Sequence, residues 1–410
     1  MHVSYQHSAI YITLEATKLK HSPRFIVLLA LATVITSAPA SAVLSPASIP
    51  AAFEELSQRP ALSNPAMILI DGTSGEVIYE KNSYSQRKPA SVMKIFAGAV
   101  AIKYLDMQSR FSTNISLGIE EKTLVIQGSN DPWISLSHSV ANKMDRTSLP
   151  YLGFNSLSAA KRSNKGSLKG FTVLYSGLYS QDVKNLKAFW AKRGFKPVMK
   201  AVTSDETLLN ASEFIVGDQS PEISKIFDYM ILWSENNLAD RLARLSAKAA
   251  GNSFNDKGVV ELFDALLMEY GIDPSKLVTK DASGLSKENR ITASMMGQLL
   301  YQLRKDPKYA LLYESLPIGG VSGTLRSRFR ETAPNAVGLV RAKTGTLNGT
   351  VTLAGYVEST DREYVFVTLA DDISRGNAAS TKARAAIDRL LGRIAAPNIP
   401  TEIVPVPATP

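Results

Sequence analysis

Strand-forming segments at both ends of the chain constrain its fold more than any other feature. Near the start, the apolar segments AMILI and EVIYE flank the polar turn Asp71–Gly75, and this order predicts a strand, a turn and a second strand. Near the end, strands are predicted at 339–343, 350–357 and 363–369, and the apolar spacing predicts a last helix over roughly 378–394. Both ends are therefore expected to be α/β with antiparallel strands, and the middle is expected to form a separate inserted piece.

The 410-residue chain is 45% hydrophobic, so it can bury a sizeable core in more than one domain. Phe25–Ile35 is apolar, follows basic residues and precedes the A-x-A sequence Ala40–Ala42. This pattern predicts a signal peptide over 1–42 and a mature protein that is secreted to the periplasm or cell-wall space. An uncleaved interfacial helix is the alternative, because the apolar run is too short to span a bilayer. Repeated prolines over 396–410 predict a loose tail.

Histidine and cysteine are too scarce for several common kinds of catalytic site. The chain has no cysteine and four histidines, of which only His138 lies beyond the expected cleavage site. A Ser-His-Asp triad would have to use that single imidazole, and a zinc site is equally poorly supplied. We therefore expect no metal and no cofactor, and a hydrolase of this composition would use lysine to activate its nucleophile.

A serine and a lysine lie three positions apart at the start of an apolar helix predicted from Ser91 to Leu105. This spacing places Ser91 and Lys94 on one face, with Ser91 at the positive end of the helix dipole. Burial and neighbouring dipoles can lower the pKa of a lysine until its neutral amine acts as a base. The ordinary alternative for this pair is a helix-capping serine and a solvated lysine.

Ser234 and Asn236 lie at the junction of two predicted helices, 221–233 and 237–249. We expect Ser220 to cap the first of these helices, with proline and glutamate following it. A hydroxyl at the junction could pass a proton to a leaving nitrogen, and a carboxamide could hold the substrate amide and a lysine together. Two helix-capping side chains are the ordinary alternative.

The segment Lys343–Thr346 follows a predicted strand, whose edge could pair with an extended peptide substrate. Lys343 and Thr344 could bind a terminal carboxylate, and Gly345 allows a close backbone approach. The backbone N–H of Thr346, together with that of Ser91, could form an oxyanion hole. A strand-end turn without a catalytic role is the ordinary alternative.

In their order along the chain, these three motifs resemble the S-x-x-K, S-x-N and K-T-G motifs of the serine penicillin-recognising enzymes. Four further segments are similar to one branch of them, the D-Ala-D-Ala carboxypeptidases/endopeptidases, or class C low-molecular-mass penicillin-binding proteins. These segments are Asp281–Ser286, Gly319–Leu325, Leu353–Tyr356 and Gly128–Pro132. The resemblance covers roughly residues 60–400.

The resemblance implies an α/β (α+β) fold, with a β-lactamase/transpeptidase-like domain whose antiparallel sheet is flanked by helices, and a smaller inserted α/β domain. On this basis the catalytic domain is assigned to 43–112 and 214–395, and the inserted basic domain to 113–213. The insertion is shorter than is usual in this branch, and Glu235 stands where aspartate is commoner. We expect the shorter insertion to affect substrate selection and to leave the catalytic part unchanged.

The implied function is that of an exported serine DD-peptidase. It would hydrolyse the terminal D-Ala-D-Ala bond of peptidoglycan stem peptides through an acyl-enzyme on Ser91, and endopeptidase action on cross-links would use the same site. β-Lactams are expected to bind covalently as inhibitors. Two alternatives stay open, a wall-binding homologue without activity and a β-lactamase.

Positive charge is concentrated in the inserted part, where residues 141–200 contain 12 Lys and Arg but only two acidic residues. This region is either a solvated face or a surface that holds the protein against anionic wall polymers. Nucleic acid is not expected as a partner, because no binding motif is present.

The segment Glu206–Asn210 matches E-x-x-L-N, the deacylating loop of class A β-lactamases. In those enzymes the loop follows the S-x-N motif, whereas here it precedes Ser234. We interpret the match as coincidence, and without such a carboxylate the release of a bound β-lactam should be slow.

Overall fold

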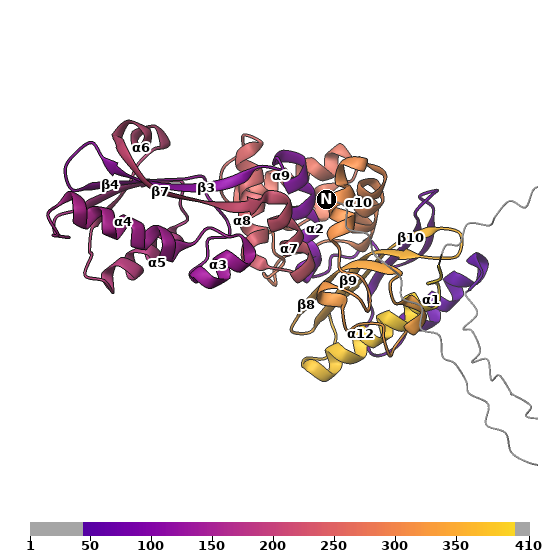
Figure 1. Cartoon of the computed structure of the whole chain (residues 1–410). Helices are drawn as coiled ribbons and strands as arrows, with labels where there is room; N and C mark the ends of the chain where they lie inside the picture. The colour runs from indigo at the N-terminus through magenta and orange to yellow at the C-terminus, as the bar shows by residue number, and fades with distance from the viewer. Residues whose placement is uncertain (1–43, 398–410) are drawn as a thin grey trace, which may run out of the picture. The chain divides into compact units, whose positions relative to one another are not determined.

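The computed structural model describes residues 44–397. The predicted signal peptide at 1–42, and all but the first two residues of the predicted tail at 396–410, lie outside the described residues. Two five-stranded sheets organise the described part, which is drawn in colour in Figure 1. Every helix among these residues is too short or too polar to cross a bilayer.

The first sheet is built from both ends of the chain. Its strand order is β2-β1-β10-β9-β8, and every neighbouring pair is antiparallel. β1 pairs with β10, with Ala66 opposite Leu369, so the predicted hairpin and the predicted C-terminal strands meet in one sheet. The strands are β1 (Ala66–Asp71), β2 (Val77–Lys81), β8 (Val340–Leu347), β9 (Thr350–Glu358) and β10 (Glu363–Ala370).

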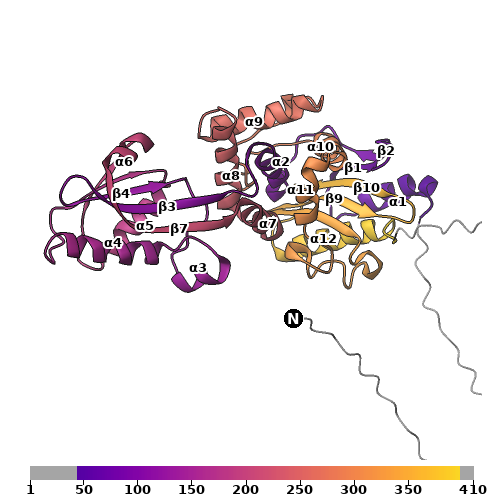
Figure 2. The ribbon, with the colours of Figure 1, turned by 45° about the horizontal axis from the view of Figure 1, so that its top comes forward.

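Helices cover both faces of this sheet, as Figures 1 and 2 show, and the predicted fold class is confirmed. All six residues of β1 are buried, because alternate side chains face opposite layers of helices. Met67 and Leu69 pack with α1 (Ile49–Ser57) and α12 (Asn377–Gly392). Ile68 and Ile70 belong to the larger core on the other face. That core includes α2 (Lys94–Tyr104), α7 (Ile223–Trp233), α8 (Asn236–Ala249), α9 (Asp256–Glu269), α10 (Ala293–Lys305) and α11 (Ala310–Ser315).

The helix α2 is surrounded by protein. Its residues from Lys94 to Ile102 are all buried, and small side chains let its neighbours come close. A Cβ atom at Gly98 would lie 3.0 Å from Leu312 Cδ1 and 3.3 Å from Ile231 Cδ1. A close-packed helix of this kind has little freedom to shift, so it holds Lys94, its first residue, in a fixed position.

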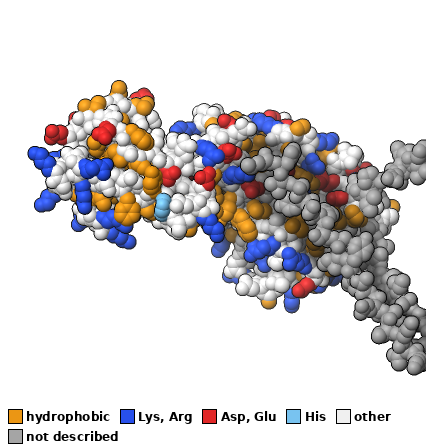
Figure 3. Space-filling model, viewed as in Figure 1, with side chains coloured by type: hydrophobic (Ala, Val, Ile, Leu, Met, Phe, Trp, Pro, Cys, Tyr) orange, Lys and Arg blue, Asp and Glu red, His pale blue; other side chains and the backbone are white. Residues whose placement is uncertain are grey.

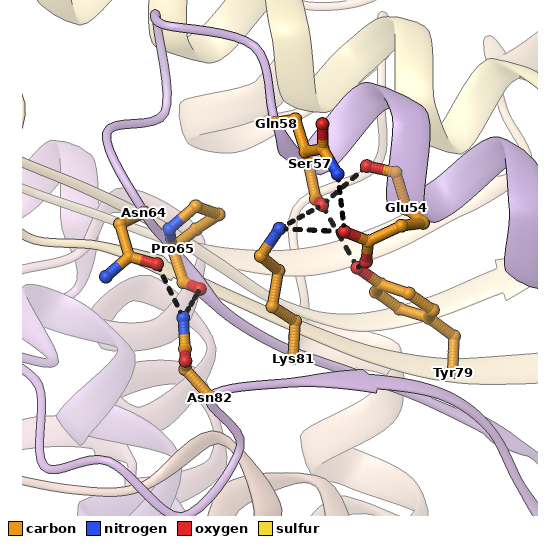
Figure 4. A network of polar contacts seen from close by, with 8 residues as sticks. All are labelled: Glu54, Ser57, Gln58, Asn64, Pro65, Tyr79, Lys81 and Asn82. Carbon is orange, nitrogen blue, oxygen red and sulfur yellow. Dashed lines mark hydrogen bonds and ion pairs between the residues drawn. The ribbon is translucent and has the colours of Figure 1, made fainter.

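A polar network joins α1 to the edge strand β2 (Figure 4). A carboxylate oxygen of Glu54 accepts a hydrogen bond from the Tyr79 hydroxyl at 2.7 Å, and the other accepts from Lys81 Nζ at 3.2 Å. Ser57 Oγ accepts from Lys81 Nζ at 3.0 Å and lies 3.0 Å from the Tyr79 hydroxyl oxygen. This network braces the edge of the sheet at β2, which is the terminal strand among the described residues.

The second sheet is formed by one continuous stretch, residues 110–222, which we call the second-sheet unit. Its strand order is β6-β5-β4-β3-β7, with parallel pairing of β5 to β4 and β6 and antiparallel pairing of β3 to β4 and β7. The boundaries predicted for the inserted domain, 113 and 213, fall within β3 and β7. The strands are β3 (Arg110–Gly118), β4 (Thr123–Gly128), β5 (Thr172–Ser176), β6 (Val198–Ala201) and β7 (Ala211–Glu222), and the helices are α3 (His138–Met144), α4 (Leu149–Ser163), α5 (Ser180–Ala191) and α6 (Ser204–Asn210).

The predicted helix cap at Ser220 is wrong. The strand β7 continues to Glu222, which pairs with Arg110 of β3, and α7 begins at Ile223. Ser220 Oγ accepts a hydrogen bond from the backbone N–H of Phe111 at 3.0 Å and donates to the carbonyl of Pro221 at 2.7 Å. Strand pairing across the unit therefore overrides the local capping signal.

The second-sheet unit begins after α2 and ends where α7 starts, and it also contacts α8. Arg241 of α8 donates to the carbonyl oxygen of Pro132 at 2.9 Å and lies 3.6 Å from the carboxylate of Asp182. Asp131 is buried beside this contact and accepts from the backbone N–H of Trp133, and burial raises its pKa. The Gly128–Pro132 segment thus marks the place where the second sheet meets the helix that carries Asn236.

Candidate active site

Ser91 lies in a short 3-10 turn, Ala90–Met93, directly before α2. The regular α-helix therefore begins three residues later than the sequence predicted. Ala90 has a φ of 48°, a left-handed conformation that is uncommon for residues other than glycine. A Cβ atom at Gly284 would lie only 1.8 Å from the carbonyl oxygen of Ala90, so the Asp281–Ser286 segment presses directly on the turn that presents Ser91.

Lys94 is completely buried, and its amine has three oxygen neighbours. Lys94 Nζ lies 3.0 Å from Ser91 Oγ, 2.7 Å from Asn236 Oδ1 and 2.6 Å from the carbonyl oxygen of Ser283. Burial lowers the pKa of Lys94 to about 8, although the nearby carboxylates, Asp240 first among them, act in the opposite direction. The amine is therefore much closer to neutrality near pH 7 than an ordinary lysine.

These three neighbours determine where the lone pair of a neutral Lys94 amine can point. The oxygens of Asn236 and Ser283 are carbonyl-type oxygens, which accept hydrogen bonds and cannot donate. They take the two N–H groups that a neutral amine retains. The lone pair is left facing Ser91 Oγ, whose hydroxyl can donate its proton, and this is the arrangement that a general base requires.

Ser234 and Asn236 flank a turn between α7 and α8. Ser234 has a φ of 63°, and the side chain that caps α8 belongs to Glu235, which accepts from the backbone N–H of Leu238 at 2.6 Å. Glu235, at the position where the S-x-N motif more often has aspartate, therefore acts as a helix cap. The Ser234 and Asn236 side chains instead contact the two lysines, Lys343 and Lys94.

Lys343 is as deeply buried as Lys94. Lys343 Nζ donates to Ser234 Oγ at 2.8 Å and to the carbonyl oxygen of Thr344 at 3.1 Å. Burial, and next the positive charge of Lys94, hold the pKa of Lys343 well below its usual range. The Lys343 amine is thus directed at Ser234, and its side chain presents no surface to solvent.

Gly345 is needed where β8 passes the Ser91 turn. A Cβ atom there would lie 2.1 Å from Thr352 Oγ1 and 2.9 Å from the carbonyl oxygen of Pro89. The sequence predicted a close backbone approach at this glycine, and the structure places that approach against Thr352 and the residues before Ser91. Any larger side chain would push the K-T-G strand away from the nucleophile.

One cavity of about 370 Å³ joins the three motifs. Five of the predicted site residues line it, and Lys94, Asn236 and Lys343 lie behind this lining, joined to it by the hydrogen bonds described above. The complete lining is Ser91, Ser234, Thr324, Ser327, Arg328, Thr344, Gly345, Thr346 and Arg384.

A sequence profile of the D-Ala-D-Ala carboxypeptidase 3 (S13) family matches residues 50–210 and 178–394, which together span most of the chain. The chain belongs to this family. The predicted enzyme class, a serine-type D-Ala-D-Ala carboxypeptidase of the low-molecular-mass penicillin-binding group, is thereby confirmed.

Two relatives and one solved structure illustrate the S13 similarity. Carboxypeptidase DacB of Mycolicibacterium smegmatis is 28% identical over 379 residues, which cover 80% of this chain and 81% of the relative. A D-alanyl-D-alanine carboxypeptidase of an Actinomadura species is 37% identical over 161 residues, or 38% of this chain and 29% of the relative. The structure of penicillin binding protein 4 from Haemophilus influenzae has a TM-score of 0.64 at 18% identity, and the match covers 83% of this chain and 97% of that one. At that identity the structure shows a shared fold.

Asp240, which holds one of the oxygen neighbours of Lys94 in place in this S13 family member, was not identified from the sequence. Asp240 accepts hydrogen bonds from the backbone N–H groups of Ala282 and Ser283, both at 2.9 Å, and so fixes the Ser283 carbonyl that contacts Lys94. Asp240 lies four residues after Asn236, one turn along α8, and this spacing was the available signal. The sequence indicates the Asp281–Ser286 segment only through its family resemblance and not through this contact.

The segment Glu206–Asn210 has a structural role in the second-sheet unit. Glu206 forms a capping box with Thr203 at the start of α6, and its carboxylate accepts from the Thr203 backbone N–H at 2.8 Å. It does not line the cavity that contains Ser91. Within residues 44–397, no group of three or more His, Cys, Asp or Glu side chains is arranged to hold a metal ion.

Proposed function

We propose that this chain hydrolyses the terminal D-Ala-D-Ala bond of peptidoglycan stem peptides through an acyl-enzyme on Ser91. The observation that carries the proposal is the buried Lys94 amine, which contacts the Ser91 hydroxyl and two carbonyl-type oxygens. The family to which the chain belongs supplies the substrate class. Residues 1–42 would direct export and then be removed, so that the enzyme meets its substrate in the periplasm or cell-wall space.

In the acylation step, Ser91 Oγ attacks the carbonyl carbon of the penultimate D-alanine while its proton moves to Lys94 Nζ. The negative charge that develops on the carbonyl oxygen is stabilised by the backbone N–H groups of Ser91 and Thr346. The carbon–nitrogen bond then breaks as the departing D-alanine nitrogen takes the proton that Lys94 received from Ser91, relayed by the hydroxyl of Ser234, which lies 2.8 Å from Lys343 Nζ. Attack by water on the ester at Ser91 releases the shortened peptide.

The test is to incubate the purified protein with a peptide ending in D-Ala-D-Ala and, separately, with penicillin. We expect release of free D-alanine. With penicillin, we expect a long-lived covalent adduct of the protein, and peptide mapping should locate it on the peptide that contains Ser91. Rapid hydrolysis of penicillin without a lasting adduct would identify a β-lactamase. The absence of both D-alanine release and adduct would identify a wall-binding homologue without activity.

We propose in addition that the second-sheet unit binds anionic wall polymers. Lys and Arg side chains are spread over the left-hand end of the molecule in Figure 3. Nine of these side chains, on α4, on α5 and in the segments that follow each helix, are exposed. None of the nine forms a salt bridge in the described part of the chain. A surface with this excess of cations attracts polyanions through long-range electrostatics. The residues are Lys161, Arg162, Lys165, Lys169, Lys184, Lys187, Lys192, Lys196 and Lys200.

Co-sedimentation with purified cell-wall sacculi checks this second proposal. Binding should weaken strongly with salt, because the Debye length falls from about 10 Å at 0.1 M to about 3 Å at 1 M. Charge reversal of Lys184 and Lys187 to glutamate should reduce the bound fraction at low salt. The control reverses two exposed cations elsewhere, Arg59 and Lys308, and should bind as the unmodified protein does. Equal losses in both variants would contradict a localised surface.

A further inference from the structure

The substrate proposed above ends in a carboxylate, and the buried Lys343 is poorly placed to neutralise it. Two hydrogen bonds of its amine are made to Ser234 and to the Thr344 carbonyl, and its side chain has no exposed surface. Thr344 and Thr346 line the cavity, and the Thr344 hydroxyl donates to Thr324 Oγ1 at 2.8 Å. Hydroxyl groups can orient a carboxylate, but they bring no positive charge.

The guanidinium of Arg384 lies beside the Thr346 hydroxyl. Arg384, on α12, donates from Nη2 to Thr346 Oγ1 at 3.1 Å and lines the same cavity as Ser91 and Ser234. This is the only hydrogen bond that its side chain makes within residues 44–397, so most of the donors of its guanidinium fork stay available. The Arg384 side chain is half-buried, which places it at the cavity wall.

The second arginine of the cavity, Arg328, is already neutralised. Its Nε and Nη2 atoms contact the carboxylate of the buried Asp388, and Nη2 also donates to the carbonyl oxygen of Arg384 at 3.2 Å. The cavity lining contains no aspartate or glutamate among the described residues. Among the described residues, Arg384 is therefore the cation of this cavity that forms no salt bridge, and the charge of Asp388, which acts on it, is already shared with Arg328.

We propose that Arg384 is a substrate-binding residue that, with the hydroxyls of Thr344 and Thr346, recognises the carboxylate on the carbon that bears the leaving nitrogen. The inference rests on the proposed function, because it assigns one part of the same substrate. Burial, and next the charge of Arg328, lower the pKa of Arg384. An entering carboxylate would offset this unfavourable environment, whereas a neutral amide could not.

The experiment compares a peptide ending in D-Ala-D-Ala as the free acid with the same peptide as its C-terminal carboxamide. For Arg384→Ala, kcat/KM on the free acid should fall by about 30-fold, the size expected for losing a charge-assisted hydrogen bond. The loss should lie mainly in KM, and kcat/KM on the carboxamide should stay close to that of the unmodified enzyme. Arg384→Lys should recover part of the loss, since it keeps the charge without the two-donor geometry.

Arg389→Ala is the matched control, because it removes an exposed arginine from the same helix. Equal losses on the acid and the carboxamide in Arg384→Ala would indicate a purely structural role and overturn the inference. An unchanged kcat/KM on the free acid would overturn it as well. If the unmodified enzyme cleaves neither peptide, the proposed function itself fails, and that result is recognisable without any variant.

Discussion

Ser91→Ala is expected to abolish covalent labelling by a fluorescent penicillin and to lower D-alanine release by at least about 10⁴-fold, because no other group replaces the attacking oxygen of a serine hydrolase. The Ser91 hydroxyl lines the cavity and touches the Lys94 amine. Alanine removes only this oxygen from the site, so the fold should persist. Gel fluorescence and a coupled D-alanine assay measure the two effects.

A remote serine provides the control for this substitution. Ser158 is exposed on α4, where its hydroxyl donates to the carbonyl of Phe154 at 3.0 Å. Ser158→Ala should be labelled at the same rate as the unmodified protein. Continued labelling of Ser91→Ala, located at a different residue by peptide mapping, would contradict the assignment of the nucleophile.

The second large effect is expected in the pH dependence of acylation, because the protonation state of Lys94 controls this step. Burial lowers the pKa of Lys94 to about 8, and the neutral amine is the form that can accept the Ser91 proton. The rate of acylation by penicillin should therefore rise by about ten-fold for each pH unit well below this value and level off above it. Stopped-flow or timed gel labelling across this range measures the profile.

Replacing the base should remove both the rate and its pH dependence. Lys94→Ala should slow acylation by about 10²–10⁴-fold, the usual contribution of a general base. Lys94→Arg should be equally slow, since a guanidinium stays protonated in proteins. Lys103→Ala, at the other end of α2, is the matched control and should keep the normal profile. An unchanged pH profile in Lys94→Ala would contradict the role of this amine.

The three motifs could be predicted from the sequence because each one combines a reactive side chain with a local element boundary. Ser91 and Lys94 are recognisable by their separation of three residues at the start of a helix, and Gly345 by the need for a close backbone approach at a strand. What the sequence could not predict was which distant groups would support them. Arg384 reaches Thr346 only because α12 packs against the sheet, and nothing in the local pattern of a C-terminal helix indicates this contact.

Two other differences have physical reasons. At Ser220, a serine followed by proline and glutamate is a typical helix start, yet pairing between β3 and β7 extends the strand through this position. Between residues 128 and 170 no helix is predicted from the sequence, whereas the side chains of Ser137 and Ser148 cap α3 and α4 by accepting from the backbone N–H groups of Val140 and Tyr151. Both serines match the helix-capping pattern, but the many polar residues around them weaken the apolar periodicity that would predict the two helices.

The pairing of β1 with β10 also bears on how the chain reaches its native state during synthesis. Translation produces β1, β2 and α2 early, whereas β10, which pairs with the other edge of β1, is among the last segments to be made. Contacts between such distant segments form slowly, and an apolar strand that awaits its neighbour is prone to aggregate. A newly made chain therefore carries its nucleophile helix through most of translation without the complete sheet, and the apolar strand β1 lacks one of its two neighbours until the final strands emerge.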